Sequence, residues 1–99
     1  MVRKWGYKDP EETKVFSFGW TKHLNDGAIV QGTNTWSATP AGLTITNESI
    51  VTGGFTTSAK IASGADGTDY VVTNRVTTSD GETLEESGRL RVRQSTTVI

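Results

Sequence analysis

The sequence predicts an all-β protein, an antiparallel β-sandwich of about seven short strands. Threonine is the most frequent residue, and together with valine and isoleucine it suits a pleated, half-buried surface better than a helix, because branching at Cβ restricts χ1. Alternating apolar and polar segments are separated by turn residues roughly every eight to twelve positions, which is typical of a sandwich. Apolar residues at helical spacing are always interrupted, so we expect at most a single helical turn, at 22–25.

Length and composition limit the protein to one domain and a few classes of function. A chain of 99 residues suffices for one small core, and it has no cysteine, so no disulfide contributes and a reducing compartment fits. The net charge of -1 argues against bulk electrostatic binding to nucleic acid or to a membrane. The basic N-terminus is not followed by an apolar run, and no stretch approaches the ~20 apolar residues of a membrane span. We therefore expect synthesis in the cytoplasm.

Period-two alternation predicts the strands before residue 64. Residues 14–20 place Phe16, Phe18 and Trp20 on one face, which is the first strand expected in the core. The strands that follow are shorter and are separated by glycine, proline and asparagine; we expect them at 28–31, 34–39 (centred on the core residue Trp36), 43–46, and 55–63 with Ala59 and Ile61 facing inward.

Residues 69–93 form a predicted β-hairpin. Asp80 and Gly81 lie between two alternating segments, and we expect a type I′ turn, which needs positive φ at both central residues. One face of each strand is apolar, and these faces match: Tyr70, Val72 and Val76 on the first strand, Leu84, Leu90 and Val92 on the second.

Tyr70 suggests a more specific architecture. It follows a loop at the start of a late strand, two residues before the inward-facing Val72, where immunoglobulin-like sandwiches place a tyrosine whose hydroxyl bonds to upstream backbone. An ordinary core tyrosine is the alternative. We predict an immunoglobulin-like fold without a disulfide. Its domain organisation is an N-terminal arm at 1–12, the β-sandwich at 13–94 and a C-terminal tail at 95–99.

No residue pattern indicates catalysis or metal binding. His23, the sole histidine, lies in a polar stretch that favours a solvated loop residue over a catalytic base, although an enzyme that depends on His23 stays a rival hypothesis. One histidine and no cysteine exclude a zinc site, and Asp66 with Asp69 fits turn chemistry better than calcium binding. We expect no enzyme, no cofactor and no metal. The adjacent acidic pairs Glu11–Glu12 and Glu85–Glu86 are expected to be solvated.

Two segments are candidates for partner binding. The last strand carries arginine at every second position, which makes a basic stripe; it is either a solvated face paired with acids or a contact for an acidic protein, and it is too small for nucleic acid. The N-terminal arm carries aromatic and basic residues without strand periodicity, and it either folds back on the sandwich or docks on a neighbouring protein. The candidate partner-binding residues are Arg3, Lys4, Trp5, Tyr7, Arg89, Arg91 and Arg93.

The sequence resembles a family of small structural proteins of tailed bacteriophages that are encoded near the major capsid protein. The similarity runs from about Lys8 to Arg93 and is carried by "KDP", "VFSFGW", "TWSATPAGLT", "GTDYVVTNRVTT", the turn at Gly81 and the terminal "LRVR". None of these motifs is catalytic.

The resemblance implies a virion protein, and we expect a decoration or cement protein that binds the major capsid protein on the outer surface of the assembled head. A homo-oligomer on the capsid is consistent with that role, and no nucleic acid or membrane partner is expected. A cement protein stabilises an assembled lattice by mass action and needs contacts rather than a reactive centre. The alternative is a tail- or fibre-associated module that recognises a host carbohydrate or protein, for which an exposed aromatic residue such as Trp36 would be needed.

Overall fold

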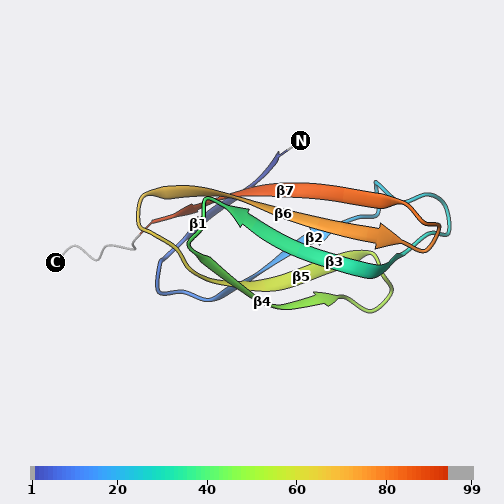
Figure 1. Ribbon diagram of the computed structural model, residues 1–99, viewed down its shortest axis with the longest axis horizontal. Coiled ribbons are helices and arrows are strands. Elements are labelled where there is room, and N and C mark those ends of the chain that lie inside the picture. The colour runs from blue at the N-terminus through green and yellow to red at the C-terminus, as the bar shows by residue number, and fades with distance from the viewer. Residues whose placement is uncertain (1, 94–99) are drawn as a thin grey trace.

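The protein is a two-layered β-sandwich, as the sequence predicts (Figure 1). The computed structural model describes the backbone of residues 2–93 and the side chains of residues 6–93, and this part of the chain contains no helix. Its seven strands are β1 (Val2–Lys8), β2 (Lys14–Gly19), β3 (Val30–Thr39), β4 (Leu43–Ile50), β5 (Thr56–Ser63), β6 (Thr68–Thr78) and β7 (Thr83–Val92).

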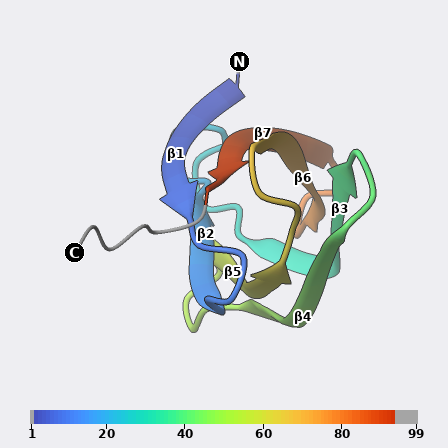
Figure 2. The ribbon, with the colours of Figure 1, turned by 90° about the vertical axis from the view of Figure 1, so that its left-hand side faces the viewer.

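The strand order is that of an immunoglobulin-like sandwich in which the first strand lies beside the last. One sheet has the order β2-β5-β4, and the other has the order β1-β7-β6-β3. These sheets correspond to strands B, E, D and to strands C, F, G of that fold. β1 pairs with β7 in parallel, whereas the other strand pairs are antiparallel. Figure 2 shows β1 closing one side of the sandwich above β2.

The N-terminal segment folds back on the sandwich, which is one of its two expected arrangements. The backbone pairing of β1 with β7 runs from Val2 opposite Ser87 to Lys8 opposite Val92. The strands therefore begin before residue 13, where the sequence analysis starts the sandwich. The pairing changes register between Lys4 and Gly6, and Gly6 has φ of 90°. This irregularity explains why the segment shows no alternation. The predicted tail at 95–99 lies outside the described residues.

A β-bulge joins two predicted strands into one. β3 contains residues 30–31 of the segment expected at 28–31 and the whole segment expected at 34–39, and it changes register between Val30 and Asn34. Gly32 has φ of 95°, and a Cβ there would lie 2.8 Å from Oγ1 of Thr77. The Thr77 hydroxyl donates to the carbonyl of Gln31 at 2.7 Å and accepts from the N–H of Thr33 at 2.9 Å, which satisfies the bulged backbone. Gly32, which the sequence pattern suggests as a turn residue between two strands, therefore forms a β-bulge within one strand.

The hairpin of β6 and β7 is confirmed, but its expected turn type is wrong. The N–H of Gly81 donates to the carbonyl of Thr78 at 3.0 Å, and the N–H of Thr78 donates to the carbonyl of Glu82 at 2.9 Å. Gly81 has φ of 88°, whereas Asp80 is not among the non-glycine residues with positive φ. This is a three-residue loop with a G1 bulge rather than a two-residue type I′ turn.

The core confirms the predicted inward faces and the position of Tyr70. The hydroxyl oxygen of Tyr70 accepts a hydrogen bond from the N–H of Ala65 at 2.9 Å, so it bonds to upstream backbone as expected of a tyrosine corner. Trp36 is 7 % exposed and belongs to the core. Buried apolar residues from both sheets form this core: Phe18, Trp20, Val30, Trp36, Ala59, Ile61, Val72, Val76 and Leu90.

Candidate functional site

The pairing of β1 with β7 brings two predicted contact segments together. Tyr7 lies opposite Arg91 in the register, and its side chain is 57 % exposed. The guanidinium carbon of Arg93 lies 5.6 Å from the centroid of the Tyr7 ring, in a cation–π arrangement. We refer to Tyr7, Arg89, Arg91 and Arg93 as the arginine–tyrosine surface.

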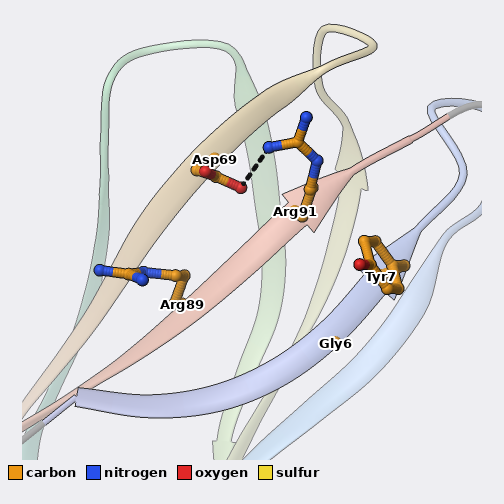
Figure 3. A pocket seen from close by; sticks show the side chains of 5 residues that line it. All are labelled: Gly6, Tyr7, Asp69, Arg89 and Arg91. Carbon is orange, nitrogen blue, oxygen red and sulfur yellow. Dashed lines mark hydrogen bonds and ion pairs between the residues drawn. The ribbon is translucent and has the colours of Figure 1, made fainter.

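A shallow hollow lies within this surface (Figure 3). It is lined by Gly6 and Tyr7 of β1, by Arg89 and Arg91 of β7, and by Asp69 of β6. Gly6 leaves the floor open, since nothing lies within 4 Å of the position that a Cβ would occupy.

The arginines of this outer sheet face differ in their ion pairing. Nη1 of Arg91 lies 3.1 Å from Oδ1 of Asp69, its neighbour on β6. Arg89 lies opposite Val71 on β6, and no hydrogen bond or ion pair joins its guanidinium to another of the described residues. The expectation of a solvated face paired with acids therefore holds for Arg91 and does not hold for Arg89.

Three predicted contact residues can be placed by their backbone alone. Arg3, Lys4 and Trp5 belong to β1, where Arg3 pairs with Gly88 and Lys4 pairs with Arg89. Their side chains lie outside the described part of the structure, so their contribution to the surface stays a prediction.

His23 is an exposed turn residue, as the sequence predicts, and it also contacts the edge of the core. Its Nε2 lies 2.9 Å from Oε2 of Glu86, and the two side chains are 44 % and 8 % exposed. Its ring meets that of Trp20 edge-on, with 5.9 Å between the centroids. The N–H of His23 donates to the carbonyl of Trp20 at 2.8 Å, within a turn close to the one expected at 22–25. This residue supports local structure by capping a buried carboxylate.

Residues 2–93 contain neither a candidate metal site nor a helix that could span a membrane. No group of three histidine or acidic side chains in this range could hold a metal ion. No helix in the same range is long and apolar enough to cross a membrane.

A second exposed cluster lies in the β4–β5 turn and beside it, and no sequence pattern predicts it. Phe55 is 48 % exposed and Val51 is 43 % exposed, both in the β4–β5 turn. A hollow beside Phe55 is lined by Thr21, Leu24, Asn25, Asp26, Gly27, Ala28 and Phe55 itself. We call Val51, Phe55 and this hollow the apolar loop surface. Counting back from the inward-facing Ala59 in steps of two predicts that Phe55 also faces inward. Because β5 begins at Thr56, Phe55 lies outside the strand and does not follow its alternation.

Comparison with known proteins identifies the family. No curated protein matches the chain. Residues 8–91, more than four-fifths of the chain, match the family described as podophage GP4 fiber-tail adaptor protein gp77. The match supports the expected bacteriophage structural protein, but it favours the tail- and fibre-associated alternative over capsid decoration and gives no support to a capsid partner. The chain therefore belongs to the family of podophage fiber-tail adaptor proteins, which are structural proteins of the phage particle.

Proposed function

We propose that this protein attaches a fibre to the tail of a podophage particle, by binding and without catalysis. The family description names that role, and one structural observation carries it to this chain. The sandwich exposes two separate clusters that carry residue types enriched at protein interfaces: arginine and tyrosine in the arginine–tyrosine surface, and phenylalanine in the apolar loop surface. An adaptor needs two such surfaces because it contacts two proteins at once.

The two surfaces lie toward opposite ends of the molecule. In Figure 1 the β6–β7 hairpin, the β2–β3 connection and the β4–β5 turn gather at one end. β7 runs from that end toward the arginines, and the eight residue-to-residue steps from Thr83 to Arg91 span roughly 26 Å at ~3.3 Å per step. The molecule has principal extents of 53 × 23 × 20 Å. One partner can therefore bind at each end without a steric clash between the two.

The chemistry of each surface suits a stable contact. Tyrosine, arginine and tryptophan are the commonest interface hot spots. We assign contact with one partner to the side chains of β1 and β7. These are Arg3, Lys4, Trp5, Tyr7, Arg89, Arg91 and Arg93. At the other end, Phe55 offers a large apolar side chain beside a hollow that a partner can fill.

Cross-linking of intact particles tests this proposal. Lys22 lies in the β2–β3 connection, near the apolar loop surface, and Lys14 lies at the start of β2; both are exposed. A lysine-reactive reagent followed by mass spectrometry is expected to join this chain to a fibre protein and to a tail protein. Cross-links to the major capsid protein without either of these would contradict the proposal and restore a role on the head.

A further inference from the structure

We propose that Arg89 receives a carboxylate from a binding partner, so that the arginine–tyrosine surface recognises an acidic segment of a tail or fibre protein. This inference rests on the proposed function, because it names the chemistry of one of the two adaptor contacts. It goes beyond that function by assigning the contact to one side chain.

The outer face of the four-stranded sheet supplies an internal comparison. Nε of Arg75 lies 3.2 Å from Oε2 of Glu85, and these residues face each other across β6 and β7. Arg91 and Asp69 are a second cross-strand pair of the same kind. Cross-strand acids thus balance two arginines of this face, as is usual on an exposed sheet.

Arg89 has no acid directly opposite it on either neighbouring strand. Its neighbour on β6 is Val71, and its neighbour on β1 is Lys4. Arg91 follows two residues later on the same face, and Arg93 two residues after that. The guanidinium of Arg89 has no ion pair among the described residues, and the cations beside it attract an anionic partner and disfavour a basic one.

The arginines that line the hollow suit a carboxylate side chain. A guanidinium donates two parallel hydrogen bonds to one carboxylate, and Arg89 lines the hollow with its donors unpaired among the described residues. In Figure 3 its guanidinium points away from Tyr7, so the carboxylate would bind at the edge of the hollow. The exposed ring of Tyr7, on the other side of the hollow, can pack against a neighbouring residue of the same partner segment. Asp69 and Glu85 on this face oppose a polyphosphate backbone, so a protein segment is favoured over nucleic acid.

The test uses phage particles that lack this protein and the purified full-length chain. Fluorescently labelled wild type is titrated onto these particles, and bound label and restored fibres are both measured. We expect Arg89→Ser to raise the Kd at least about 10-fold, because arginine truncations at interface centres are among the costliest. Arg75→Ser is the matched control from the same face, with an expected change below about 2-fold. Arg89→Lys should fall between them, because it keeps the charge and loses the planar fork.

A second arm tests the chemistry of the partner. Carboxylates on the deficient particles are converted to neutral methylamides with a carbodiimide and methylamine. Wild type should then bind as weakly as Arg89→Ser binds to untreated particles, and Arg89→Ser should show little further loss.

The outcomes separate the two proposals. If wild type neither binds the deficient particles nor restores fibres, the adaptor function is overturned and this inference with it. If wild type restores fibres while Arg89→Ser binds equally well, or while methylamidation leaves its binding unchanged, the acidic contact at Arg89 is overturned and the adaptor function stands.

Discussion

The hydroxyl of Thr57 on β5 donates a hydrogen bond to Oδ1 of Asn74 on β6, and this bond joins the two sheets through the core. The indole N–H of Trp20 donates to Oγ1 of Thr57 at 2.9 Å. On the other side, Asn74 donates to Oδ1 of Asn34 at 2.8 Å, and Trp36 donates to the same oxygen at 3.0 Å. In antibody domains a disulfide joins the sheets beside a tryptophan on strand C. Here a buried chain of hydrogen bonds joins them in a protein without cysteine.

Removal of Asn74 should therefore be costly. Asn74→Ala leaves the Thr57 hydroxyl and the carbonyl of Thr35 without this partner and opens a cavity, so we expect a loss of about 3 kcal/mol in the free energy of unfolding. Urea denaturation of both proteins measures this loss. The neighbouring Thr73 faces outward, and Thr73→Ala should cost less than about 1 kcal/mol. Equal losses for the two variants would contradict a structural role for the chain of hydrogen bonds.

The hydroxyl of Tyr70 should stabilise the β5–β6 loop. Tyr70→Phe removes the acceptor of the Ala65 N–H and keeps the ring, so the free energy of unfolding should fall by about 1–2 kcal/mol. Tyr7→Phe is the control, because Tyr7 is exposed on β1, and its effect should stay within about 0.5 kcal/mol. Thermal denaturation of both variants distinguishes a tyrosine corner from an ordinary core tyrosine, for which neither substitution would matter.

Substitutions at two glycines of the β5–β6 loop should distinguish backbone strain from steric conflict. Gly64 has φ of 105°, and a Cβ there would lie 2.6 Å from Cγ2 of Val92. Gly67 has φ of 82° and nothing within 4 Å of that position. Gly67→Ala should cost about 1–2 kcal/mol through the left-handed backbone alone, and Gly64→Ala should cost clearly more. A Gly67→Ala variant that is the less stable of the two by urea denaturation would contradict the packing of the loop against β7.

Lys8 should make the free energy of unfolding depend on pH in the alkaline range. Its ammonium donates to the carbonyls of Asp9 at 2.8 Å and Ser63 at 2.6 Å. Burial lowers the pKa of Lys8 below its usual 10.5, against the opposing effect of the carboxylates of Glu12 and Asp9. The unfolded chain therefore binds more protons between the two pKa values, and this residue's contribution to stability rises with pH through that window.

The Lys8→Met variant isolates this contribution, since tyrosines and the remaining lysines titrate alike in both proteins. The free energy of unfolding of wild type minus that of Lys8→Met should increase as the pH approaches 10.5. A difference that is flat or that decreases would show that burial does not dominate the environment of the Lys8 ammonium.

Alternation predicted most of the fold because it is a local property. It placed Phe18, Trp20, Ile61, Val72 and Leu90 on inward faces, and it placed Arg89, Arg91 and Arg93 on one outward face. Strand pairing is not local, and the places where the expectation differed depend on it. β1 pairs with a strand about 85 residues away in the sequence, and the bulge at Gly32 depends on the side chain of Thr77.

The candidate surfaces could be predicted in part for the same reason. The arginines were found from their spacing, but the absence of an acid opposite Arg89 follows from the register of β6 and β7, in which Val71 rather than Asp69 is its neighbour. The apolar loop surface has no periodic signal, because Phe55 lies one residue before β5 begins.

The adaptor function is tested most directly by the ratio of fibre protein to major capsid protein in particles that lack this chain, measured by quantitative mass spectrometry. We predict heads and tails in normal amounts with the fibre protein reduced to background, and recovery of the fibre protein when the wild-type chain is supplied. A normal fibre ratio in these particles would contradict the account.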